Sequence, residues 1–221
     1  PVGEVWGNVS VSGSIIMKDH VHLYGGFEGD ETDRSQRAPT CFVTVIDGSN
    51  GRGPGTPAYH TVVFGKSATP TIDSVLDGFR ITGGQAAGAG GSDYHTYRGG
   101  GIYNWLSSPT IANCTIFQNA AAVSGGGIAN ESDLTYTAAP SVENCVFYDN
   151  GAGRGPDGVG RPIRGGGAVF NNFAGATYTH CTLYANAVAN PGYTLFGANS
   201  AGMYSWSSQT TVIGTIVYNN A

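Results

Sequence analysis

The sequence is poor in charged residues. Lys, Arg, Asp and Glu together make up 11% of the 221 residues, against about 25% in ordinary globular domains. Lys18 and Lys66 are the only lysines, and the ten basic residues are scattered singly along a chain with a formal net charge of −5. Because binding to a phosphate backbone requires clustered basic side chains, nucleic acid is not an expected partner.

Long apolar runs are also lacking. No stretch of about 18 or more apolar residues occurs, so the sequence predicts no membrane span in this segment. The chain begins at Pro1 without a leader, and we expect a single domain over residues 1–221 that is a module or processed part of a longer rod. The abundance of Ser, Thr, Asn, Gly and Tyr is typical of secreted β-proteins and predicts an extracellular, cell-surface location.

Glycine, in contrast, is plentiful, with 36 residues in the chain. Collagen does not explain this number, because no Gly-X-Y triplet persists. Disorder does not explain it either, because 40% of the residues are hydrophobic. The glycines are therefore expected in ordered, tightly turning backbone.

One unit recurs in the second half of the chain. It begins with a glycine triplet, continues through short apolar segments and ends in asparagine; its copies span 99–119, 125–150, 165–186 and, in degenerate form, 201–219. The segments alternate in polarity and are bounded by turn residues, a pattern that predicts short strands. Such strands cannot bury a face alone, whereas coils stacked about 4.8 Å apart share one interior. The predicted fold is all-β, a right-handed parallel β-helix of about seven coils with loop insertions on one side.

Equivalent positions of the repeat predict files of stacked side chains. Cys114, Cys145 and Cys181 share one slot and are expected as buried free thiols between Phe79 and Gly214. A disulfide or a metal site stays open as an alternative, although parallel Cβ vectors hold neighbouring sulfurs too far apart for a good disulfide. The closing residues are expected to form a structural asparagine ladder; they are Asn119, Asn150, Asn186 and Asn219.

The repeat carries a family resemblance. Gly-Gly-Gly-Ile-Tyr-Asn at 99–104, with Ser-Pro-Thr-Ile at 108–111 and Asn-Cys-Thr at 113–115, resembles repeats of polymorphic outer-membrane-type and pectate-lyase-like β-helix proteins. The segments 21–27 and 43–48 are similar to the opening coils of large bacterial surface proteins of this type. The resemblance implies the fold and an exported location. It implies no single activity, because such solenoids serve as lyases, adhesins and spacers.

Long insertions precede each glycine triplet and are expected to project from one side of the rod. Their aromatic and arginine side chains, with two tryptophans that follow the glycine-proximal strands, are candidates for binding a surface polysaccharide. Aromatic rings that merely cover the end of a coil are an equal alternative. The candidates are Tyr94, Tyr97, Arg98, Trp105 and Trp206.

Two groups of charged residues are candidates for chemistry. The run Glu28, Asp30, Glu31 and Asp33 is a weak candidate for Ca²⁺, and no other cofactor is expected. Because Arg34 and Arg37 follow at once, a salt-bridged loop is favoured over a metal site. Four isolated charged residues could meet on one face of the rod, namely Asp47, Asp73, Asp77 and Arg80. Catalysis by them is not favoured, because Asp47 and Asp77 each precede glycine in a turn, where a carboxylate usually caps backbone amides.

The last residues match the middle of a coil. An uncovered coil invites end-on stacking with copies of the chain or with further β-helix coils. The favoured hypothesis is a non-enzymatic structural or adhesive module of an extracellular surface protein or filament. The alternative is a carbohydrate-active β-helix, either similar to polysaccharide lyases or sugar-binding.

Overall fold

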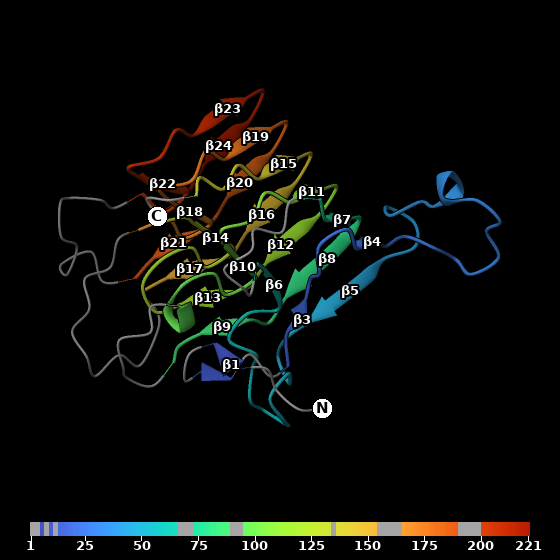
Figure 1. Ribbon diagram of the computed structural model, residues 1–221, viewed down its shortest axis with the longest axis horizontal. Helices are drawn as coiled ribbons and strands as arrows, with labels where there is room; N and C mark the ends of the chain where they lie inside the picture. Colours follow the sequence, from blue (N-terminus) through green and yellow to red (C-terminus); the bar gives the residue numbers. More distant parts are fainter. Residues whose placement is uncertain are drawn as a thin grey trace.

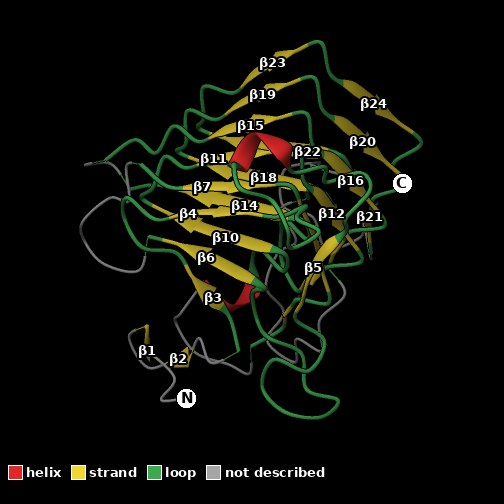
Figure 2. Ribbon diagram, turned by 90° about the vertical axis from the view of Figure 1, so that its right-hand side faces the viewer, coloured by secondary structure: helices red, strands yellow, loops and turns green. Residues whose placement is uncertain are grey.

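The computed structural model describes residues 5–6, 9–10, 13–65, 73–88, 95–133, 136–153, 165–189 and 200–221. Its strands form four sheets in which every neighbouring pair is parallel, and one small antiparallel pair, β1 (Val5–Trp6) with β2 (Val9–Ser10). Figures 1 and 2 show the strands of successive coils stacked above one another, and the colours of Figure 1 follow the chain order from blue to red.

Each coil visits the sheets in the same order. The first sheet contains β3 (Ile15–Ile16), β6 (Val62–Phe64), β10 (Ile102–Trp105), β14 (Ile128–Glu131), β18 (Val169–Asn172) and β22 (Met203–Trp206). The second contains β4 (His22–Tyr24), β7 (Val75–Asp77), β11 (Thr110–Ala112), β15 (Ser141–Glu143), β19 (Thr177–Thr179) and β23 (Thr211–Ile213). The third contains β5 (Thr44–Asp47), β8 (Phe79–Thr82), β12 (Thr115–Phe117), β16 (Val146–Tyr148), β20 (Thr182–Tyr184) and β24 (Ile216–Tyr218).

A fourth, narrower sheet closes the coil. Its strands are β9 (Gln85–Ala86), β13 (Ala120–Ala121), β17 (Gly151–Ala152) and β21 (Ala187–Val188). These residues were predicted to begin the loop insertions, and instead they pair in register before the chain leaves the body. The parallel β-helix prediction is confirmed, and the described coils number six, where about seven were expected.

Single residues in left-handed backbone make the corners. Between the second and third sheets these are Asn113, Asn144 and His180, with φ of 51°, 50° and 53°, each stacked on the one below. Asparagine tolerates this conformation better than other residues with a Cβ. In these coils the chain therefore turns sharply within one residue and keeps the same register.

The predicted cysteine file lies inside the rod. Cys114, Cys145 and Cys181 are at most 1% exposed and are free thiols, and the Cys114 amide donates to the Cys145 sulfur at 3.4 Å. Burial raises the pKa of the Cys145 and Cys181 thiols. In the sixth coil the slot holds Thr215, whose hydroxyl accepts from the Cys181 amide at 3.1 Å. The prediction of Gly214 is wrong by one residue.

The predicted asparagine ladder is present, with one correction. The side-chain amide of Asn119 donates to Asn150 at 3.1 Å, that of Asn150 to Asn186 at 3.0 Å, and that of Asn186 to Asn220 at 2.9 Å. Asn219 was predicted in this last place, but its backbone, with φ of 50°, forms the exposed corner beside the ladder.

A second internal ladder was not predicted. Asn104, Asn130 and Asn171 on the first sheet are fully buried and bond to one another at 3.2 and 2.9 Å. The hydroxyl of Tyr178 donates to Asn171 at 3.0 Å and accepts from Asn130 at 2.9 Å. Burial raises the pKa of this phenol. Both ladders supply partners for polar atoms that water does not reach.

The sixth coil exposes apolar side chains. Ile216 and Val217 are 59% and 52% exposed, and Val212, Ile213 and Tyr218 are similar. End-on stacking on this coil stays a prediction.

Replacing Asn150 by alanine tests the first ladder. The side chain accepts from Asn119 and donates to the Ile116 carbonyl at 2.8 Å as well as to Asn186. Because the change leaves buried partners unsatisfied, we expect Asn150→Ala to lower the free energy of unfolding by about 3 kcal/mol in urea titrations. The exposed neighbour gives the control, since Asp149→Asn is expected to change it by less than about 0.5 kcal/mol. Similar losses in both variants would contradict the ladder.

Candidate functional site

The predicted ligand-binding residues separate into two groups. Trp105 and Trp206 are half-buried and lie on the outer face of the first sheet. Tyr97 and Arg98 were expected on projecting loops, but they are only 1% and 5% exposed, so this part of the prediction is wrong. Tyr94 lies outside the described residues.

The two tryptophans end one row of side chains. This row, which we call the outer row, crosses β10, β14, β18 and β22 in register. Its residues are Trp105, Glu131, Asn172 and Trp206. Three coil steps separate the indoles, about 14 Å along the rod. The row thus places a carboxylate and an amide between two aromatic rings.

A buried ion pair fixes the centre of the outer row. Arg98, which follows the short 3₁₀ helix η2 (His95–Tyr97), donates to a carboxylate oxygen of Glu131. The two side chains are 7% and 4% exposed, and the guanidinium carbon lies 5.1 Å from the centre of the Phe170 ring. Breaking such a pair leaves one buried charge uncompensated and typically costs about 3–5 kcal/mol. The pair therefore attaches η2 to the outer face.

Two histidines pack on the same face. His95 makes edge contacts with Tyr103 and Trp105, with ring centres 5.4 and 4.9 Å apart. His60 is 1% exposed, lies 5.0 Å from the Tyr103 ring, and donates from Nδ1–H to the Gly99 carbonyl at 2.8 Å. Burial lowers the pKa of His60 to about 4, and His95 nearby acts in the same direction. His60 is thus a neutral packing residue at pH 7.

A second feature lies at the other side of the molecule. Residues 26–43, which we call the arm, leave the body after β4 and return at β5, and they carry the 3₁₀ helix η1 (Arg34–Gln36). Figure 1 shows the arm projecting away from the stacked sheets. The Ala38 amide donates to the Gly26 carbonyl at 2.7 Å, so the two limbs of the arm are joined near its base.

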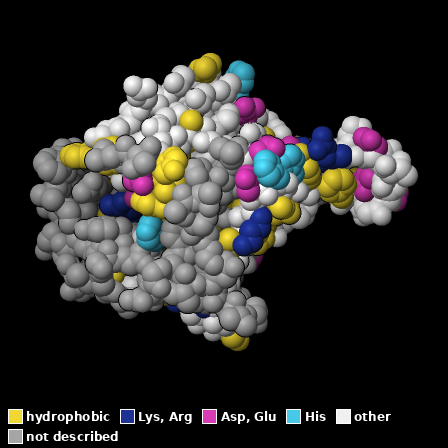
Figure 3. All heavy atoms as spheres, viewed as in Figure 1, with side chains coloured by type: hydrophobic (Ala, Val, Ile, Leu, Met, Phe, Trp, Pro, Cys, Tyr) yellow, Lys and Arg dark blue, Asp and Glu magenta, His cyan; other side chains and the backbone are white. Residues whose placement is uncertain are grey.

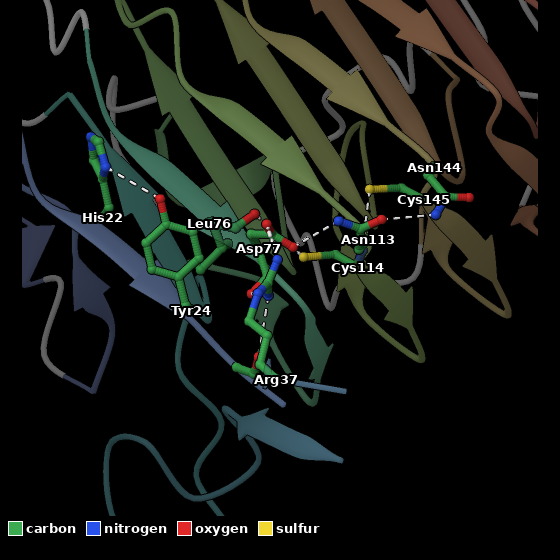
Figure 4. Close-up of polar contacts among 10 residues, drawn as sticks. His22, Tyr24, Arg37, Leu76, Asp77, Asn113, Cys114, Asn144 and Cys145 are labelled. Carbon is green, nitrogen blue, oxygen red and sulfur yellow. Dashed lines mark hydrogen bonds and ion pairs between the residues drawn. The ribbon is translucent and has the colours of Figure 1, made fainter. Parts of the chain in front are cut away.

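Arg37 anchors the arm to the second coil. Its guanidinium pairs with the carboxylate of Asp77 and donates to the carbonyl of Gly25 at 3.2 Å. The other oxygen of Asp77 accepts from Asn113 at 2.8 Å, and Asn113 in turn accepts from Asn144 at 2.8 Å. Figure 4 shows this chain of contacts running along the corner between the second and third sheets. Both oxygens of Asp77 are therefore occupied.

A groove of about 980 Å³ lies between the arm and the body. One wall is the returning limb of the arm, and the floor is the outer face of β8, β12 and β16 with the corner beside them. Its lining is Asp33, Arg34, Ser35, Arg37, Pro39, Thr40, Val43, Thr44, Gly78, Phe79, Arg80, Asn113, Cys114, Thr115, Asn144 and Val146.

The acidic run stabilises its own loop. Glu31 accepts from the amides of Glu28 and Gly29 at 2.6 and 2.8 Å, and Asp33 caps η1 by accepting from the Ser35 amide at 2.8 Å. The two amides lower the pKa of the Glu31 carboxyl, and the Ser35 hydroxyl, which donates to Asp33 at 2.6 Å, lowers the pKa of Asp33 together with the Ser35 amide. Within the described ranges no three His, Cys, Asp or Glu side chains are placed to share a metal ion.

The ion-pair prediction for this loop needs correction. Arg37 was expected to pair within the acidic run and instead pairs with Asp77. Arg34 lies over the ring of Tyr24, with 4.5 Å from its guanidinium carbon to the ring centre.

The isolated polar groups considered for catalysis do not share one site. Arg80 lines the groove, whereas Asp47, Asp73 and Asp77 lie outside its lining. Asp47 accepts from the Ser49 amide at 2.8 Å, which is the turn-capping role that the sequence favoured. Asp73 is exposed, with its oxygens 3.4 Å from His20 and 3.6 Å from His22.

Comparison with known proteins gives one match. A family model described as a right-handed beta helix region matches residues 43–221. No curated protein and no solved structure matches the chain. In the part of the chain that the structure describes, no helix is long and apolar enough to cross a membrane.

The burial of His60 predicts that the folded chain is less stable at acidic pH. In the unfolded chain this histidine takes up a proton near its ordinary pKa of 6.5, but in the folded chain only near 4. The unfolded state therefore binds more protons between these values, so the free energy of unfolding falls as the pH is lowered through this window, by about 3 kcal/mol for this residue. We expect the pH dependence of urea unfolding to flatten in His60→Gln.

The control for this measurement is His180→Asn. His180 is exposed at a corner where the two coils below carry asparagine. This variant should keep the dependence of the wild-type chain. An unchanged dependence in His60→Gln would show that His60 is not the responsible group.

Proposed function

We propose that this chain, which belongs to the family of right-handed β-helix proteins, is a non-enzymatic structural or adhesive module of an extracellular cell-surface protein. The family fixes the fold and leaves the activity open, because the same solenoid carries unrelated functions. The proposal therefore rests on whether the buried carboxylates, which catalysis would need as acids or bases, are free or paired.

The buried carboxylates carry the proposal. Among the described acidic residues only Asp77 and Glu131 are buried. Each is paired with an arginine from a different part of the chain, Arg37 or Arg98. A general acid or base must exchange its proton with a substrate, whereas these two carboxylates hold the arm and η2 against the body. Their positions support a scaffold.

The interior supports the same function. Two ladders of buried asparagines run through successive coils and bond each coil to the next. Such a ladder joins one coil to the next and supports a stiff rod whose exterior is free to vary. A rod of this kind suits a protein that presents surfaces at a distance from a cell.

Sugar binding on the outer row is a second candidate. Trp105 and Trp206 are partly exposed indoles, and Asn172 between them is half-buried. Aromatic faces that flank polar groups suit sugar rings, which are apolar on their faces and polar at their edges. This arrangement is the observation that favours the candidate.

The third sheet is less suited to sugars, although it carries more aromatic rings. Phe117, Tyr148, Tyr184 and Tyr218 stack on one another with ring centres 5.1, 5.4 and 5.5 Å apart and planes within 14° of parallel. Each ring face between neighbours is covered, so mainly edges meet solvent. This stack stabilises the sheet and leaves little face for a ligand.

An activity and retention assay tests both candidates. The purified chain is incubated with acidic and neutral polysaccharides, with and without Ca²⁺, and unsaturated and reducing ends are measured. We expect none above the level of heat-denatured protein. Product that forms with the wild-type chain and is absent with Asp77→Asn or Glu131→Gln, each shown to be folded by circular dichroism, would overturn the proposal.

The same polysaccharides, immobilised in a gel, separate the two candidates. Retardation of the wild-type chain that is lost in Trp105→Ala and Trp206→Ala would establish the sugar-binding candidate. Tyr218→Ala is the matched control, because it removes an exposed aromatic ring from the third sheet. Equal mobility of all variants would count against sugar recognition by the outer row.

A further inference from the structure

The tip of the arm carries charges that the described chain does not neutralise. Glu28 and Asp30 are exposed and make no ion pair with the described residues, whereas Glu31 binds the amides of its own loop. Phe27 beside them is 40% exposed. In Figure 3 acidic atoms lie on the far end of the projecting arm, away from the body. The tip thus combines one apolar ring with two free carboxylates.

The groove beneath the arm has the complementary chemistry. Three of the ten basic residues of the chain line it, namely Arg34, Arg37 and Arg80. Arg37 is neutralised by Asp77, whereas Arg34 and Arg80 are exposed and make no ion pair with the described residues. The lining holds one carboxylate, Asp33, which caps η1, so the arginines outnumber the acids and the groove favours an anionic occupant.

Apolar side chains lie beside these charges. Val43 in the lining is 43% exposed. Val45 is 51% exposed and pairs in register with Arg80 on the neighbouring strand. An occupant that brings an apolar side chain together with carboxylates therefore fits better than a purely ionic one.

The shape of the groove further restricts which kind of ligand can occupy it. Its floor strands β8, β12 and β16 are paired on both sides, so the floor itself offers no free edge to an added peptide strand. The Tyr24 ring nearby lies under Arg34 and Arg37, and Phe79 is 8% exposed. Without an open aromatic face, the groove favours the side chains of an acidic loop over sugar rings.

We propose that the arm tip of one copy, residues 27–31, docks in the groove of a second copy. Glu28 and Asp30 then meet Arg34 and Arg80, and Phe27 covers the exposed valines. Tip and groove are complementary parts of one chain, so two copies can exchange arms reciprocally about a two-fold axis. This inference goes beyond the proposed function and is independent of it, because a catalytic or a structural chain can form the same clasp.

Analytical ultracentrifugation over a range of protein concentrations at low salt tests the clasp. We expect the wild-type chain to dimerise, and added salt to weaken the dimer because the ion pairs are exposed. Asp30→Arg and Arg80→Glu each place like charges opposite one another and are each expected to raise the dimer dissociation constant at least about tenfold. A chain that stays monomeric at every concentration overturns the proposal.

Mixing the two variants gives the decisive result. In an equimolar mixture, the tip of Asp30→Arg faces the groove of Arg80→Glu, and we expect association to return between the two variants while each alone stays monomeric. No gain on mixing overturns the clasp. Association of both single variants at the wild-type level also overturns it. That result would indicate a contact that does not depend on these charges, such as stacking on the sixth coil.

Matched controls keep the charge change constant. Glu143→Arg and Lys18→Glu alter exposed residues outside the groove by the same amount, and both should dimerise as the wild-type chain does. Circular dichroism confirms that each variant is folded. If Arg80→Glu is not folded, Arg34→Glu replaces it in the mixture with the same expected outcomes.

Discussion

In-register pairing of successive coils is the constraint on which the whole structure depends. Because the strands of the four sheets pair in parallel with the equivalent strands of neighbouring coils, each position of the repeat lies over the same position of the next coil. A residue type that suits an interior slot in one coil can therefore recur in that slot of the next coil. Buried thiols, bonded amides and stacked rings form files for this one reason, and the left-handed corners keep the files aligned.

The repeat made much of this interior predictable, up to the point where its markers disappear. Cys114, Cys145 and Cys181 fixed the alignment of three coils. The sixth coil has threonine in the cysteine slot and two adjacent asparagines at its end. Without the cysteine as a marker, the pattern predicted Asn219 in the ladder, whereas the structure has Asn220 there. The fourth sheet was not predicted because its strands, such as Ala120–Ala121, have two residues and are too short to show an alternation of polar and apolar side chains.

The candidate site was less predictable because its contacts join distant segments. Arg98 and Glu131 are 33 residues apart, and Arg37 and Asp77 are 40 apart, so neither pair has a signature in local spacing. Both pairs depend on how a long connection returns to the body, which no periodic pattern encodes. The asparagines of the second ladder did have a signal, since each stands two residues after the inward residue that opens a strand of the first sheet.

The count of reactive thiols tests the stacked interior most directly. The chain has one exposed cysteine, Cys41, and the three buried ones of the central file. With a thiol reagent and mass spectrometry, we expect one label on the native chain and four labels after unfolding in denaturant. Rapid native labelling of Cys114, Cys145 or Cys181 would contradict a continuous file of side chains inside the rod.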